Sequence, residues 1–148
     1  MGLSSRSAVG IHALTKLAHQ GEGSLTSAEI ADSLASNPVL VRRILGSLRD
    51  AGLVWATEGR GGGWSLARAP REITLLDAYR AVEAGPVLSR HAHPPNDACE
   101  VGRHMQAVLE REFREAEHAL EERLGRTTIA HLVRETVERE RAVTHPGS

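Results

Sequence analysis

Apolar residues recur at helical spacing along most of the chain. The clearest stripe is Val41, Ile44, Leu45 and Leu48, at i, i+3, i+4 and i+7, which predicts one buried face of a helix. Similar spacing predicts a helix over residues 5–19, a two-turn helix around Ile30, and helices over 74–83, 100–124 and from 128 onward.

The boundaries of two early helices are marked by capping residues. Thr26 and Glu29 form a Thr-x-x-Glu capping box, with Leu25 before it. Asn37 is a favourable N-cap residue, and Pro38 is suited to the first helical position. A short helix, a turn and a helix that begins with proline predict a helix-turn-helix.

A β-hairpin is predicted directly after this helix-turn-helix. Two β-prone runs, Leu53–Thr57 and Trp64–Ala67, flank a glycine-rich loop with Arg60 near its tip. A hairpin in this position is a wing. We therefore expect a mainly α fold with a small β-hairpin: a winged helix-turn-helix domain followed by a long C-terminal dimerisation helix.

The predicted helix over residues 100–124 is too long for a small domain to cover. About 25 residues at about 1.5 Å each span about 37 Å, so its apolar stripe requires a second chain. The expected organisation is a DNA-binding domain over 1–83, a connecting loop over 84–98, dimerisation helices over 99–140 and a disordered tail over 141–148. The candidate dimer contacts are Val101, Met105, Val108, Phe113, Leu120 and Leu124.

Charge is divided unevenly along the chain, although the net charge is only −1. Residues 1–71 carry eight basic and five acidic side chains, whereas residues 72–148 carry ten and fourteen. A basic first half suits DNA binding, and an acidic second half suits an assembly element.

The face of the third predicted helix opposite its apolar stripe suits contact with DNA. It carries Val39, Arg43, Gly46 and Asp50, flanked by Arg42 and Ser47. Arginine can bind guanine edges or phosphates, and small residues permit close approach. The alternative is an ordinary solvated face. The candidate DNA contacts are Thr26, Ser27, Asn37, Val39, Arg42, Arg43 and, in the wing, Arg60.

The single cysteine, Cys99, excludes a disulfide within one chain. A position at a helix N-terminus lowers a thiol pKa, although Asp97 and Glu100 oppose this effect. Cys99 is thus either a redox sensor or an inert thiol. Together with His91, His93 and His104 it matches no standard zinc spacing, so neither a metal nor a cofactor is expected.

The sequence does not support an enzyme, a membrane protein or a secreted protein. There is no catalytic constellation, so we do not expect an enzyme. No apolar run is long enough to cross a membrane, and no secretion signal is visible. A cytoplasmic location is expected.

Several motifs together resemble the Rrf-two family of bacterial winged-helix regulators. They include Ser4-Ser5-Arg6-x-Ala8 at the start, Thr26-x-x-Glu29-Ile30-Ala31, the run PVLVRRILGSLRDAGLV and the segment GRGGGWSLARAPREITLLDAYRAVE. The similarity extends from about residue 4 to about residue 135. The later run HPPNDACEVGRHMQAVL looks like the subgroup that lacks a cluster-binding cysteine triad.

The resemblance implies a homodimeric DNA-binding transcription regulator, most often a repressor, which recognises a palindromic operator. Family base-contacting positions fall on Asn37, Val39 and Arg42, while the usual wing arginine position is occupied by Glu58, leaving Arg60 to substitute.

With only Cys99 present, a three-cysteine iron–sulfur cluster cannot form. The alternatives are a winged-helix protein-interaction module without DNA affinity, and a regulator switched at Cys99 by thiol oxidation or metal. The expected partners are double-stranded DNA, a second copy of the chain and a small-molecule or oxidant effector.

Overall fold

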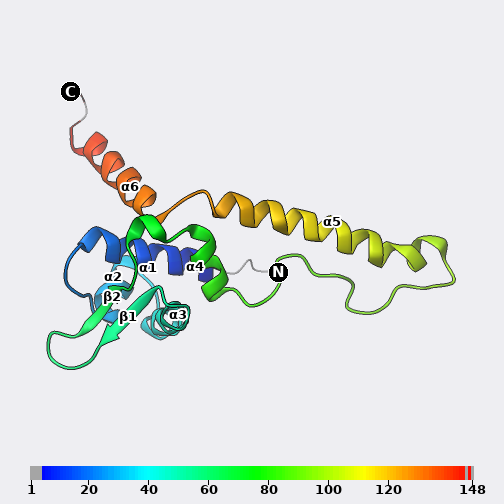
Figure 1. Cartoon of the computed structure of the whole chain (residues 1–148), viewed down its shortest axis with the longest axis horizontal. Coiled ribbons are helices and arrows are strands. Elements are labelled where there is room, and N and C mark those ends of the chain that lie inside the picture. The colour runs from blue at the N-terminus through cyan, green and yellow to red at the C-terminus, as the bar shows by residue number, and fades with distance from the viewer. Residues whose placement is uncertain (1–4, 146, 148) are drawn as a thin grey trace. The chain divides into compact units, whose positions relative to one another are not determined.

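Helices make up most of the chain and are interrupted by one two-stranded hairpin (Figure 1). The computed structural model describes residues 5–145 and 147. These helices and the single hairpin confirm the expected mainly α fold with a wing. The elements are α1 (Arg6–Gln20), α2 (Ser27–Leu34), α3 (Pro38–Asp50), β1 (Val54–Thr57), β2 (Gly63–Leu66), a 3-10 turn (Pro70–Glu72), α4 (Leu75–Val82), α5 (Glu100–Leu124) and α6 (Ile129–Thr144).

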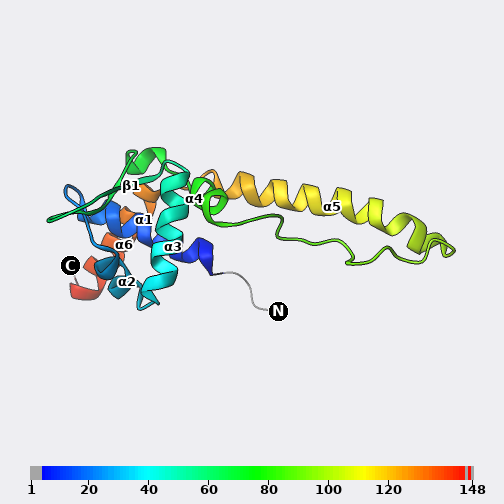
Figure 2. The same cartoon turned by 90° about the horizontal axis from the view of Figure 1, so that it is seen from below.

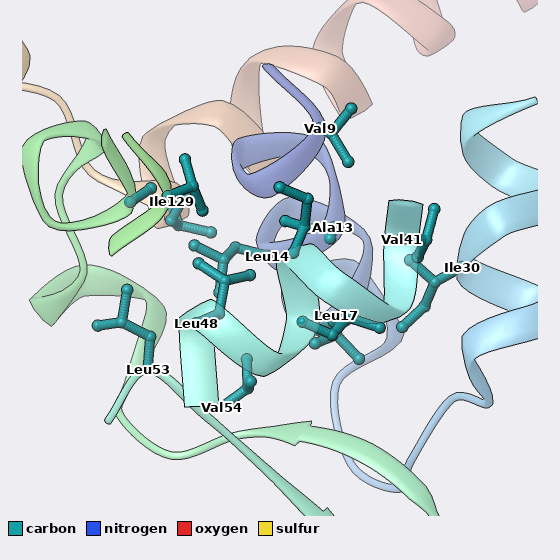
Figure 3. Close-up of a cluster of buried hydrophobic side chains, with 14 of the residues drawn as sticks. Val9, Ala13, Leu14, Leu17, Ile30, Val41, Leu48, Leu53, Val54 and Ile129 are labelled. Carbon is teal, nitrogen blue, oxygen red and sulfur yellow. The ribbon is translucent and has the colours of Figure 1, made fainter. Parts of the chain in front are cut away.

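The core forms where α1, α3 and α4 meet, and α3 lies across α1 (Figure 2). The predicted stripe of α3 is fully buried: Val41, Ile44, Leu45 and Leu48 have no exposed surface. Gly10 lets α1 approach α4, since a Cβ at this position would lie 3.3 Å from Val82 Cγ1. Figure 3 shows side chains from α1, α3, β1 and α6 converging in this core.

The predicted helix starts are confirmed by hydrogen bonds. The Thr26 hydroxyl accepts from Glu29 N at 3.2 Å, and Glu29 Oε2 accepts from Thr26 N at 2.7 Å. Thr74 and Asp77 form the same reciprocal pair at the start of α4. Each box pairs backbone N–H groups that a helix start leaves without an intrahelical partner.

The wing contains a contact that the local sequence does not predict. β1 and β2 pair antiparallel, with Trp55 opposite Ser65 and Ala56 opposite Trp64. Leu25, in the loop between α1 and α2, also bridges Trp64, with N···O distances of 3.0 and 2.7 Å. The wing is thereby fastened to the segment that leads into the helix-turn-helix.

Helix α6 belongs with the winged helix, which differs from the expected grouping of residues 99–140. The chain forms two compact units, Ala84–Leu124 and the rest of the described chain. Ile129, at the start of α6, is fully buried, and its N–H donates to Ile73 O at 2.9 Å. The expected separation fails because the strand-like pairing of Thr74 with Thr128 draws the chain back to α4.

The prediction of a disordered tail over residues 141–148 is wrong for residues 141–144, since α6 continues to Thr144. The Thr144 hydroxyl donates to Glu140 O at 3.0 Å, and Arg139 pairs with Glu135 one turn earlier at 3.3 Å. Such i, i+4 contacts extend a helix. Residues 146 and 148 of that prediction lie outside the described residues.

The second unit consists of α5 and the loop before it. The loop is fastened along the helix: Leu88 N donates to Glu117 Oε1 at 3.2 Å, and Arg90 pairs with Glu110 at 3.4 Å. No side chain of α5 is buried. Among the described residues, no helix has the length and apolar character needed to cross a membrane.

Candidate nucleic-acid interface

The exposed face of α3 is basic and carries one exposed aliphatic side chain. Arg42 and Arg43 are exposed, and within residues 5–145 neither guanidinium is held by a hydrogen bond or an ion pair. Val39, on the same side, is 56% exposed. The buried stripe fixes this orientation, so both guanidinium groups are free to bind an acceptor outside the protein.

Asn37 lies at the N-terminal edge of this face and caps the helix. Its Oδ1 accepts from Val39 N at 2.8 Å. The predicted N-cap is therefore confirmed. The same bond uses one of the two lone pairs of the side-chain oxygen and leaves the NH₂ group for donation.

Thr26 and Ser27 are the two candidates at the start of α2. The Thr26 hydroxyl donates to Glu29 Oε2 at 3.0 Å as well as accepting from Glu29 N. The backbone and hydroxyl bonds from Thr26 lower the pKa of Glu29, which keeps its carboxylate ionised within the cap. Ser27 is half-buried. Capping is thus the role that the geometry gives Thr26.

The wing presents Arg60 at an exposed tip, and within the described chain it also has no ion pair or hydrogen bond. Gly62 makes this tip possible. Its N–H donates to Gly59 O at 3.0 Å, and a Cβ at this position would overlap the carbonyl oxygen of Thr57. Any larger residue at position 62 must shift the backbone of the turn.

The sequence predictions missed two serines that fasten the wing and one exposed aromatic side chain on it. Ser24 and Ser65 fasten the wing, with hydroxyls donating to Gly61 O at 3.3 Å and Gly23 O at 3.1 Å. Trp55 is 61% exposed on β1. Period-two alternation with the buried Val54 could have identified Trp55 as an outward-facing residue.

The apolar stripe predicted on α5 is exposed to solvent within the unit Ala84–Leu124. Val101 is 61% exposed, Val108 42% and Leu120 36%. Met105, Phe113 and Leu124 are half-exposed. A row of aliphatic side chains left in solvent is typical of a protein–protein interface.

Cys99 lies immediately before α5 in a tightly folded loop. Backbone hydrogen bonds from Gly102 and Val101 lower the pKa of its exposed thiol. Asn96 shapes this loop, because its Oδ1 accepts from Ala98 N at 3.0 Å and its carbonyl accepts from Cys99 N at 3.3 Å. The lowered pKa raises the fraction of thiolate at this accessible thiol.

An apolar groove of about 490 Å³ lies between α1 and α6, lined by Ile11, Leu132 and the stems of His12 and Lys16. Elsewhere in the described parts of the chain, no three His, Cys, Asp or Glu side chains converge to hold a metal ion.

Comparison with known proteins gives consistent matches over most of the chain. Residues 3–135 match the model of the Rrf2 family, described as an iron-dependent transcriptional regulator. YwnA of Bacillus subtilis, named as an HTH-type transcriptional regulator, is 36% identical over 132 residues, covering 88% of this chain and 96% of its own.

Solved structures match the arrangement of the helices as well. The structure of T. potens IscR aligns with a TM-score of 0.69 at 26% identity, over 92% of this chain and 88% of its own. CymR, titled the global cysteine regulator of B. subtilis, aligns with a TM-score of 0.67 at 25% identity, over 91% of this chain and 98% of its own.

The iron in the family's description does not fit the residues of this chain. One cysteine is present in the whole sequence, and among the described residues no group of three or more His, Cys, Asp or Glu side chains is placed to hold a metal ion. A cluster held by three thiolates of one chain is thus excluded. The family match, the 36% identical relative and the shared winged-helix fold nevertheless agree: this chain belongs to the Rrf2 family of transcriptional regulators.

Proposed function

We propose that this regulator binds a palindromic DNA operator as a homodimer and represses transcription from it. The observation that carries the proposal is the pair Arg42 and Arg43, exposed and unpaired within the described chain on the face of α3 opposite the core. Such a helix enters the major groove, where arginine distinguishes guanine from the other bases.

A second chain is required to place two such helices on one duplex. The exposed stripe of α5 supplies the contact, since Val101, Val108 and Leu120 have no cover in their own unit. Twofold symmetry then presents the two α3 helices to successive major grooves about 34 Å apart. An operator with matching half-sites follows from this symmetry.

The proposal is tested by selecting duplexes from a random pool with the purified full chain. We expect the enriched sequences to share an inverted repeat, and binding to weaken steeply with salt because phosphate contacts release counterions. Absence of enrichment would instead favour the alternative, a winged-helix module that binds protein and not DNA. Repression is measured separately, with a reporter gene placed behind the selected operator.

The wing provides a contact that is largely independent of sequence. Arg60→Ala should lower the salt slope of binding by about one unit while changing sequence preference little. Gly62→Ala should have a similar effect, because a Cβ there displaces the turn that presents Arg60. Binding isotherms over a salt series measure both effects.

The double variant tests whether Gly62 acts by positioning Arg60. If it does, the variant with both changes should bind no more weakly than Gly62→Ala alone. Additive losses would show that Gly62 supports some other part of the interface. Melting temperatures of all three variants identify any general loss of stability.

A second candidate function, control by thiol oxidation, is favoured by the lowered pKa of Cys99. The thiolate would attack a peroxide, so that one oxygen is transferred to sulfur, the O–O bond breaks and hydroxide or alkoxide leaves. The sulfenic acid formed in this way lies directly before α5. Oxidation at this place would disturb the dimer and release the DNA.

Cys99→Ser should retain operator affinity and lose release by peroxide, because a hydroxyl does not react in this way. Binding is measured before and after peroxide treatment, with addition of a thiol reductant to restore the wild type. Equal responses of the wild type and Cys99→Ser would exclude the thiol as the sensor.

A further inference from the structure

We infer that Asn37 and Val39 together recognise one thymine in each half-site. The inference rests on the proposed DNA binding and goes further, because it assigns a base to a particular pair of side chains. It depends on the hydrogen bond that caps α3 and on the exposure of one valine.

The cap restricts what Asn37 can bind. A free asparagine side chain recognises adenine by donating with its NH₂ group and accepting with its oxygen. Here the oxygen accepts from Val39 N at 2.8 Å. Breaking that bond would leave a helix N–H unpaired at the DNA surface and cost about tenfold in stability of the cap. The contact that the cap leaves fully available to Asn37 is therefore donation from its NH₂ group.

Val39 supplies an apolar contact beside that donor. The cap bond joins the Asn37 side chain to the Val39 backbone, so the amide group of Asn37 lies beside the backbone of Val39 at the start of α3. Val39 is 56% exposed, whereas the core residues Val41 and Ile44 of the same helix are fully buried. Its isopropyl group therefore remains available to an apolar partner outside the domain.

A donor beside a methyl-binding group matches thymine in the major groove. Thymine presents the O4 acceptor next to the C5 methyl group. Guanine presents acceptors without a methyl group, adenine presents an acceptor and a donor, and cytosine presents a donor. Only the thymine edge matches both Asn37 and Val39, which leaves guanine to Arg42.

The methyl contact is tested by replacing each operator thymine in turn with deoxyuridine, which removes only the methyl group. At one symmetric position, the wild type should lose about fourfold in affinity, the effect of burying one methyl group. The Val39→Ala variant should bind the thymine and uracil operators equally. Val143→Ala, which removes the same atoms from a valine that is 74% exposed on α6, should retain the fourfold difference.

The donor is tested with Asn37→Asp, which keeps an oxygen for the cap and removes the NH₂ group. Its melting temperature should be unchanged. Its ratio of affinities for the operator and a random duplex should fall about tenfold, since this ratio cancels the effect of the added charge.

Two results would overturn the inference. One is an operator on which no uracil replacement weakens binding. The other is a uracil penalty that persists in Val39→Ala. If the wild type bound the operator specifically in either case, the proposed function would stand without this inference; if it preferred no duplex at all, both would be rejected.

Discussion

Replacing Val108 and Leu120 together by glutamate should convert the protein to a monomer and reduce its operator affinity by about 100-fold or more. Both side chains are exposed on the α5 stripe, at 42% and 36%. A carboxylate buried in an apolar interface has no partner and loses its hydration. A monomer also loses the gain in affinity that comes from linking two half-site contacts.

Light scattering measures the molecular mass, and binding isotherms on the selected operator measure the affinity. The matched control carries Ala107→Glu and His118→Glu, which place two carboxylates on exposed positions of the opposite face of the same helix. This control should remain dimeric. Circular dichroism should show equal helix content in all three proteins, because the core of the winged helix contains no residue of α5. A double variant on the stripe that remained a dimer would exclude this face as the interface.

Arg42→Ala should lower operator affinity by about 1–3 kcal/mol, or about 5- to 150-fold, and reduce the preference for the operator over random DNA. Arg42 is exposed on α3 and has no partner within residues 5–145 that could compensate for its loss. Its guanidinium can donate two parallel hydrogen bonds to O6 and N7 of guanine. One operator guanine should weaken binding of the wild type when it is replaced, but not binding of Arg42→Ala. That guanine is the base that Arg42 contacts.

Arg49→Ala is the matched control, because it removes the same charge from the same helix. Arg49 lies in the last turn of α3 and pairs with Asp50 at 3.5 Å. Its loss should weaken binding to operator and random duplex by the same small factor. An unchanged affinity ratio in Arg42→Ala, or an equal fall in both variants, would show that Arg42 does not recognise a base.

The helix boundaries of the winged helix could be predicted because their causes are local. A capping box needs only two residues three positions apart, so Thr26 with Glu29 indicated the start of α2. The 3.6-residue period similarly identified the buried stripe of α3 and the bounds of α5. The exposed positions of Arg42 and Arg43 then follow, since they lie away from that stripe.

Contacts between distant segments depended on the tertiary structure. In the sequence, Ile129 is one apolar residue among several in the last helix. Only the return of the chain to α4 buries it, and this decides that α6 belongs to the winged-helix unit and not with α5. Nor could the sequence show that Leu25 bridges Trp64. Periodicity and capping act within one or two helical turns, whereas these pairings join residues about 40 or more positions apart and form only when the whole core packs.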